Sequence, residues 1–289
     1  TLSFNNDALV NVTLTNFDTS KLLSGQSFTV TGTSQKDTIV GSANADNIDG
    51  GAGDDILING SGNDFIYGQD GDDIFYGGAG KDKIYGWKGE DIIYGEDGDD
   101  YLKGHSGKDK LYGGAGEDTL YGGTSKDELH GGDGDDKLYG GSSSDILYGD
   151  DGDDYLKGHS GDDILYGGED DDYLRGGDDR DYLYGDSGDD LLKGEDGDDE
   201  LVGGTGKDDL YGGKGNDRFV LTAGSGYDRI RDFKKGEDRV DIAEYDINEL
   251  GVFDSGKNIK VYLDKERSDL LAIIYNHNLN GGSLSEFIF

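Results

Sequence analysis

The chain has 289 residues and is strongly acidic, with 64 Asp and Glu residues against 26 Lys and Arg residues and a formal net charge of −38. This charge argues against a nucleic-acid-binding protein, which needs a basic surface. The absence of Cys excludes disulfides and Cys-based zinc or redox sites. No stretch approaches the roughly 20 apolar residues of a membrane-spanning helix. Because only 32% of the residues are hydrophobic, we expect the chain to stay unfolded unless something neutralises its carboxylates.

Residues 1–31 differ in kind from the rest of the chain. Short apolar runs at residues 1–4, 9–14 and 27–30 predict strands, and this region contains no metal-site pattern. We expect residues 1–31 to form an N-terminal β cap that shields the open end of the region that follows. A linker to an upstream domain is the alternative.

Residues 32–220 consist of a nine-residue unit that recurs without insertion or deletion. The sixth position is Asp in every unit from Asp37 to Asp217, which makes 21 units, and the eighth position is always apolar. The first position is Gly in every unit except one, where Asn59 takes its place. A chain with this period is a repeat protein.

The composition of the unit predicts how it folds. Its first six positions are rich in Gly, which favours turns, and its last three, such as residues 119–121, place one apolar side chain between two outward ones. One inward residue per strand cannot be buried alone, so the units must stack into a coil. Two consecutive units would close one turn of this coil. The predicted fold is therefore all-β, with two parallel sheets around a thin apolar core.

Stacking also brings the Asp residues together. Units on the same side of the coil would repeat at about 4.8 Å, the spacing of parallel strands, so carboxylates of successive turns would repel one another. A hard cation removes this repulsion, and Asp carboxylates together with loop carbonyls suit Ca²⁺ better than Mg²⁺. We therefore expect multiple Ca²⁺ ions.

The unit resembles the Gly-Gly-x-Gly-x-Asp-x-apolar-x nonapeptide of RTX (repeats-in-toxin) proteins, which residues 131–139 match in full. The resemblance implies a parallel β-roll, a two-sheet right-handed solenoid with calcium held between successive turns. It also implies type I secretion from a Gram-negative cell and an extracellular or cell-surface location. In family terms the sixth-position Asp is the side-chain ligand, which gives these predicted metal residues: Asp55, Asp64, Asp73, Asp82, Asp91, Asp100, Asp109, Asp118, Asp127, Asp136, Asp145, Asp154, Asp163, Asp172, Asp181, Asp190, Asp199, Asp208 and Asp217.

Some units depart from this pattern at the fourth position. The first two units, residues 32–40 and 41–49, have Gln35 and Asn44 in place of Gly, and we expect weak or absent ion sites there. Four later loops are doubtful ion sites for the same reason, because the fourth position is occupied by Ser125, Ser143, Asp170 and Asp179.

Outward positions of alternate units form a strip on one face of the predicted roll. We call it the tyrosine strip, and it contains Tyr76, Tyr94, Tyr112, Tyr148, Tyr166 and Tyr184. One hypothesis is that the strip binds a glycan or a cell-surface partner, because exposed apolar patches commonly mark contacts. The alternative, which we favour, is that stacked rings stabilise adjacent strands.

Residues 221–289 leave the nine-residue period. Residues 226–233 and 236–242 resemble the segment that follows the roll in serralysin-type proteases and other secreted RTX proteins. Residues 259–263 and 270–275 predict strands of a C-terminal β cap. Residues 284–289 are similar to the uncleaved C-terminal signals of type I secretion, although an ordinary final strand explains them as well.

The sequence offers little sign of catalysis. The run Gly185-Asp186-Ser187-Gly188 resembles a serine-protease motif but fills positions one to four of a unit, and no His-Glu-x-x-His run exists for zinc. We therefore expect a non-enzymatic calcium-binding module that folds on Ca²⁺ after type I secretion. Because the chain contains no Met, it is expected to be processed or cut from something longer. One alternative is that it is the C-terminal calcium-binding and secretion region of a larger secreted hydrolase (protease or lipase), epimerase or toxin. A surface adhesin or matrix protein that binds glycan through the tyrosine strip is a further alternative.

Overall fold

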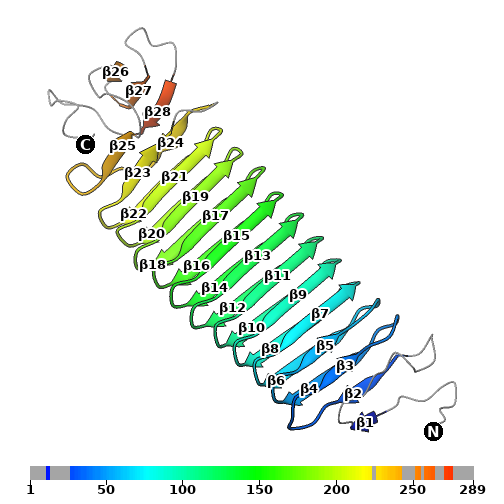
Figure 1. Cartoon of the computed structure of the whole chain (residues 1–289). Coiled ribbons are helices and arrows are strands. Elements are labelled where there is room, and N and C mark those ends of the chain that lie inside the picture. Colours follow the sequence, from blue (N-terminus) through cyan, green and yellow to red (C-terminus); the bar gives the residue numbers. More distant parts are fainter. Residues whose placement is uncertain are drawn as a thin grey trace. The chain divides into compact units, whose positions relative to one another are not determined.

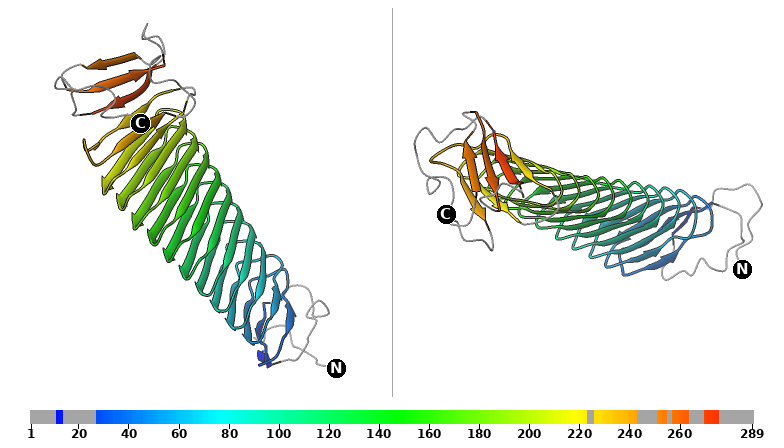
Figure 2. Two further views of the ribbon diagram at one scale, coloured as in Figure 1. Left: turned by 60° about the vertical axis from the view of Figure 1, so that its left-hand side comes forward. Right: turned by 90° about the horizontal axis from the view of Figure 1, so that it is seen from above.

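The computed structural model describes residues 11–13, 27–222, 226–242, 251–254, 257–263 and 270–275. These residues are all-β and fall into two compact units, Thr1–Asp145 and Ile146–Phe289. In each unit the strands form two parallel layers joined by loops, as Figures 1 and 2 show. The predicted fold class, a parallel β-roll, is confirmed. The division into residues 1–31, 32–220 and 221–289 stays a prediction.

The described residues of the first unit form strands in two sheets. One sheet has the order β1 (Asn11–Thr13), β2 (Thr29–Thr31), β4 (Asn47–Ala52), β6 (Phe65–Asp70), β8 (Lys83–Lys88), β10 (Tyr101–Ser106), β12 (Thr119–Thr124) and β14 (Lys137–Ser142). The other has the order β3 (Thr38–Val40), β5 (Ile56–Ile58), β7 (Ile74–Ala79), β9 (Ile92–Asp97), β11 (Lys110–Ala115) and β13 (Glu128–Asp133). Within the repeats each strand residue pairs with its counterpart two units later, such as Leu102 with Leu120, so two units form one turn.

The second unit continues this architecture and ends in an antiparallel extension. One sheet has the order β16 (Tyr155–Ser160), β18 (Tyr173–Asp178), β20 (Leu191–Asp196), β22 (Asp209–Lys214), β24 (Asp228–Ile230), β28 (Leu270–Ile274), β27 (Ile259–Tyr262) and β26 (Gly251–Asp254). The other has the order β15 (Ile146–Asp151), β17 (Ile164–Glu169), β19 (Tyr182–Ser187), β21 (Glu200–Thr205), β23 (Arg218–Leu221) and β25 (Arg239–Ile242).

Most repeat strands are longer than the sequence suggested. A typical strand such as β12 covers positions seven to nine and continues through positions one to three of the next unit. The eighth and first positions both point inward, so most units contribute an apolar side chain and a buried Gly to the interior. The expectation of a three-residue strand was too short, because the Gly-rich positions keep pairing with the next turn before the chain bends.

A single column of apolar side chains fills the space between the sheets of each unit. The eighth-position residues from Ile48 to Phe219 are all 0% exposed. Within the described repeats no second apolar layer lies behind them, because the other buried positions are Gly (Asn59 in one unit) and the position-six Asp. These repeats therefore depend on continuous stacking, and a single turn has no core of its own.

The residues after the repeats extend both sheets. Strands β24 and β25 pair in parallel with β22 and β23. Residues 226–233 and 236–242, which resemble the segment that follows the roll in other RTX proteins, therefore add one more parallel strand to each sheet. The predicted strands at residues 259–263 and 270–275 correspond to β27 and β28. The predicted strand at residues 1–4 and the proposed secretion signal at residues 284–289 lie outside the described residues.

The rings of the tyrosine strip are stacked along the coil. Tyr94 lies between Tyr76 and Tyr112 with ring centroids 5.2 and 4.9 Å apart and planes 11° and 12° apart. In the second unit, Tyr166 stacks on Tyr148 at 5.0 Å. Because neighbouring rings cover one another's faces, little face is left for a sugar ring to stack on. This geometry favours the stabilising role of the strip.

Replacement of Leu120 by Ala should lower the free energy of unfolding of the folded chain by about 2–5 kcal/mol, because it leaves a cavity between paired strands. Urea unfolding measures the change. Replacement of the adjacent outward Thr119 by Ala should cost less than about 1 kcal/mol. Equal losses in the two variants would contradict the single-column core.

Candidate metal centre

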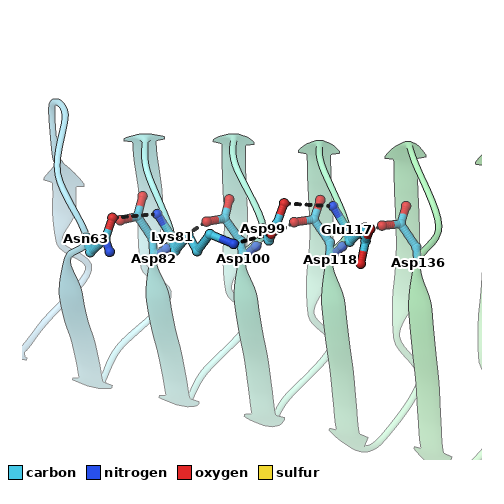
Figure 3. Close-up of polar contacts among 8 residues, drawn as sticks. All are labelled: Asn63, Lys81, Asp82, Asp99, Asp100, Glu117, Asp118 and Asp136. Atoms are coloured by element: carbon cyan, nitrogen blue, oxygen red, sulfur yellow. Dashed lines mark hydrogen bonds and ion pairs between the residues drawn. The ribbon is translucent and has the colours of Figure 1, made fainter.

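The Asp residues at position six lie in the loops that join the two layers. All 19 predicted metal residues are buried, with exposures of 0–3%. Within each compact unit, one carboxylate oxygen of these residues accepts a hydrogen bond from the preceding turn, as Figure 3 shows along one edge. Asp118 Oδ1 accepts a hydrogen bond of 2.7 Å from the backbone N–H of Asp100, and Asp100 Oδ1 accepts one of 2.7 Å from that of Asp82. The carboxylates thus form an inner ladder that links successive loops.

In 14 of these residues the other carboxylate oxygen, Oδ2, has no comparable donor. It is buried and without a hydrogen-bond partner in Asp55, Asp64, Asp73, Asp82, Asp91, Asp100, Asp109, Asp118, Asp127, Asp172, Asp181, Asp190, Asp199 and Asp217. A buried anionic oxygen without a partner costs several kcal/mol, so it requires a proton or a cation.

The pKa values of these carboxyl groups are raised, which reflects the free-energy cost of burying their negative charge. Burial raises them from the ordinary 3.8, and in most of them a neighbouring carboxylate raises them further. The pKa rises to about 6 in Asp64, Asp73, Asp109, Asp118 and Asp217, about 7 in Asp55, Asp190 and Asp199, about 8 in Asp91, Asp100, Asp127 and Asp172, and about 9 in Asp181. Without a cation, the inner ladder would be substantially protonated at neutral pH.

The space beside each Oδ2 is narrow and oxygen-lined. A Cβ atom placed on Gly113, the first residue of its unit, would lie 2.3 Å from Asp118 Oδ2 and 2.5 Å from the carbonyl oxygen of Gly131. The first position must therefore be Gly in most units. Carboxylate and carbonyl oxygens approach one another here from successive loops, and this donor set suits a hard cation.

Side chains alone would not complete the coordination shell. Within the part of the chain that the structure describes, no group of three His, Cys, Asp or Glu side chains converges on one point. A metal at the inner ladder would therefore take most of its ligands from backbone carbonyls. Ca²⁺ accepts six to eight oxygen ligands of mixed type, so the residues fit this ion.

A second, outer ladder lies at position five and was missed by sequence reasoning. Asp99 Oδ1 accepts a hydrogen bond from the backbone N–H of Glu117 at 3.2 Å, and Asn63 Oδ1 accepts one from that of Lys81 at 3.0 Å (Figure 3). These side chains are exposed and Lys81 also pairs with Asp99, which lowers the pKa of that carboxyl group. The signal in the sequence was the frequent Asp or Asn at the fifth position.

In the first two inner-ladder residues, Oδ2 accepts hydrogen bonds from groups of the same loop. Asp37 Oδ2 accepts bonds from the N–H and hydroxyl of Thr33 at 2.6 and 2.8 Å. Asp46 Oδ2 accepts one from the N–H of Ser42 at 2.6 Å. These oxygens are satisfied without a metal, which gives a physical basis for the weak sites expected in the first two units.

The inner ladder extends beyond the regular repeats in the second unit. Asp238 Oδ1 accepts the N–H of Asp217 at 3.1 Å and its Oδ2 accepts that of Lys234 at 2.7 Å. Asp228 is 4% exposed, and burial together with the adjacent Asp208 raises its pKa. Sequence reasoning missed both residues, although each lies in a Gly-x-Asp-x-apolar run. Asp228 and Asp238 follow Asp217 at intervals of 11 and 10 residues and not nine, and this concealed the repeat.

Loss of the fourth-position Gly leaves a positive but smaller φ angle. Ser125, Ser143, Asp170 and Asp179 have φ angles of 86°, 83°, 75° and 79°, in the left-handed region that favours Gly, whereas Gly116 and Gly134 have φ angles of 135° and 122°. The four residues therefore carry some backbone strain. Whether they bind ions less well stays a prediction.

These features define a repeat protein of the parallel β-roll class, in which each turn presents a buried carboxylate and converging carbonyls. Segments that together cover residues 31–219 match the family model of the RTX calcium-binding nonapeptide repeat (4 copies), namely residues 31–66, 58–93, 67–102, 94–129, 121–156, 148–183, 157–192 and 184–219.

The chain belongs to the RTX calcium-binding nonapeptide repeat family. Comparison with curated proteins gives no match. RTX repeats are not catalytic in themselves, and they are typical of secreted proteins of Gram-negative bacteria. Among the described residues, no helix has the length and apolar character needed to cross a membrane.

The raised pKa values predict that the metal-free roll is most stable in acid. The folded carboxyl groups bind protons more tightly than those of the unfolded chain, whose pKa is about 3.9. The free energy of unfolding should therefore fall as the pH rises from about 4 through the folded values of about 6 to 9. In EDTA, far-UV circular dichroism should show more β structure at pH 5 than at pH 8, in samples shown to be monodisperse. A β signal that grows with pH would contradict this.

Proposed function

We propose that this chain is a calcium-binding module that folds when Ca²⁺ binds between its loops. In this proposal the side-chain ligands are the 19 position-six Asp residues from Asp55 to Asp217. The buried Oδ2 atoms without hydrogen-bond partners carry the proposal, because their cost is removed by a bound cation. Membership of a calcium-binding repeat family supports Ca²⁺ as that cation.

The donor set supports Ca²⁺ over Mg²⁺. The Oδ2 atoms and loop carbonyls are fixed by the strand spacing, and backbone groups dominate. Ca²⁺ tolerates irregular shells of this kind at about 2.3–2.6 Å, whereas Mg²⁺ requires a near-octahedral shell at about 2.0–2.1 Å and retains its waters. Bound Ca²⁺ would supply the positive charge that the inner ladder needs.

The same electrostatics support a role in export. In a calcium-poor cytosol, repulsion among carboxylates of a chain with a net charge of −38 would keep it unfolded, as passage through a type I secretion channel requires. Outside the cell, millimolar calcium matches the roughly 10⁻⁴–10⁻³ M affinities of extracellular modules. Folding would start at the hydrogen-bonded turns near Asp238 and spread by nearest-neighbour stacking. An enzymatic domain upstream of these repeats is compatible with this function.

Replacement of Asp118 by Asn tests the ligand assignment. The amide can still accept the hydrogen bond from Asp100 N–H, but it lacks the charge. We expect the calcium affinity of the adjacent sites to fall by about tenfold or more. The metal-free chain should become easier to fold, because a buried charge is removed. Chelator-competition titration and urea unfolding in EDTA measure these two effects.

Glu117→Gln is the matched control, since Glu117 is the exposed neighbour in the same loop and its backbone N–H rather than its side chain joins the outer ladder. It should leave calcium affinity nearly unchanged. Equal effects of the two substitutions would show that general charge, and not ligation by Asp118, controls calcium binding.

A further inference from the structure

Asn59 is the one residue other than Gly at the first position of the 21 units. It follows β5 and opens the loop that ends at Asp64. In the equivalent places of neighbouring units, a Cβ atom on Gly50 would lie 2.6 Å from Asp55 Oδ2, and one on Gly77 would lie 2.8 Å from the Oδ2 of its own Asp. The side chain of Asn59 therefore starts at the place that faces the carboxylate of Asp64.

The Asn59 side chain coincides with a local loss of regular structure. Strand β5 and its neighbour β3 in the same sheet have three residues, whereas the next strand, β7, has six. Its pairing with β3 and β7 covers three residue pairs each, and beyond them an isolated bridge joins Ser61 to Ala79. The backbone N–H of Asn59 still donates to the carbonyl oxygen of Tyr76 at 2.8 Å, so the loop keeps its register.

Three polar atoms without well-formed hydrogen bonds meet at this place. Asn59 is 7% exposed, and both its Oδ1 and its Nδ2 atoms are buried without a hydrogen bond. Asp64 is 0% exposed, and its Oδ2 atom is also buried without a hydrogen bond. In neighbouring units a first-position Cβ atom would lie within 3 Å of the equivalent Oδ2 atom, as at Gly50 (2.6 Å) and Gly77 (2.8 Å), so the two side chains face each other.

Asp46, one turn before Asp64 on the same edge, is an example of a carboxylate oxygen that is satisfied by a hydrogen bond from its own loop. Asp46 Oδ2 accepts a short bond from Ser42 N–H and needs no other partner. The Asn59 amide makes no bond of such geometry to Asp64. A bond from Nδ2 to Oδ2 would still leave the amide oxygen unsatisfied, whereas a cation held by both oxygens satisfies the two at once.

We propose that Asn59 Oδ1 and Asp64 Oδ2 together form a hard-cation site that has two side-chain ligands from one loop. Loops with Gly at the first position offer one. The proposal rests on the proposed function and deepens it, because it assigns a distinct ligand set to one site of the series. The ion is Ca²⁺ or another divalent cation that prefers oxygen ligands. Because of the additional ligand, this site should bind its ion more tightly than the other sites on the same edge. The loop one turn before it, residues 41–46, has its Asp46 Oδ2 satisfied by a hydrogen bond.

Two substitutions distinguish an Asn59 side chain that binds the ion from one that only fills the space beside Asp64 and forms a hydrogen bond there. Asn59→Gly removes the amide and restores the sequence of the other units, and Asn59→Asp keeps an oxygen ligand but removes the N–H donors. Calcium titration by chelator competition should show that Asn59→Gly weakens one ion by about tenfold, equivalent to ~1.4 kcal/mol, while Asn59→Asp retains it. The exposed fifth-position control Asn63→Ser should match the parent chain. An added ion or tighter binding in Asn59→Gly, or loss of the ion in Asn59→Asp, overturns the proposal.

Crystals of the calcium-loaded parent chain provide the direct observation. The anomalous difference map should place an ion within about 2.3–2.6 Å of both Asn59 Oδ1 and Asp64 Oδ2. Ions at other loops with none beside Asn59 would overturn this inference and leave the proposed function standing. An absence of ions from every loop would overturn both.

Discussion

A buried carboxylate with one satisfied oxygen is the constraint on which the rest of this fold depends. In inner-ladder residues such as Asp100 and Asp118, Oδ1 accepts a backbone N–H from the preceding turn and so fixes the stacking of the loops. Oδ2 of these residues lies in a narrow, oxygen-lined space where an unpaired charge is costly. Stacking and charge compensation are therefore one problem. In the proposed account, the chain closes its turns when protons or cations occupy the space beside Oδ2.

This constraint explains the unusual composition. The first position is Gly because a side chain there would collide with the carboxylate, and the core is one residue wide because Gly is the other inward residue. Such a core is too thin to offset the repulsion of the inner ladder by burial alone. The Asp residues at the two ends of the inner ladder differ from the others in their hydrogen bonds. Asp37, Asp46 and Asp238 receive hydrogen bonds from their own loops, so their Oδ2 atoms have partners without an ion.

The sequence predicted the fold because its period is regular. Asp at position six and an apolar residue at position eight are in phase from Asp37 to Phe219, and this determined the two sheets and the turn of two units. Three features could not be predicted in this way. The extra rungs at Asp228 and Asp238 fall outside the nine-residue period, and only pairing with β22 and β23 reveals them. The outer ladder depends on backbone N–H groups whose direction no residue pattern gives. The role of Asn59 depends on which atoms are left without partners.

Calcium titration of EDTA-stripped protein, followed by far-UV circular dichroism with magnesium as the control, tests the central claim most directly. If calcium compensates the buried Oδ2 atoms, a cooperative coil-to-β transition should occur between submillimolar and millimolar calcium, and magnesium should not produce it. A chain that is already fully folded in EDTA at neutral pH, or that responds equally to both ions, would contradict the claim. The inner ladder would then be a structural element that needs no metal.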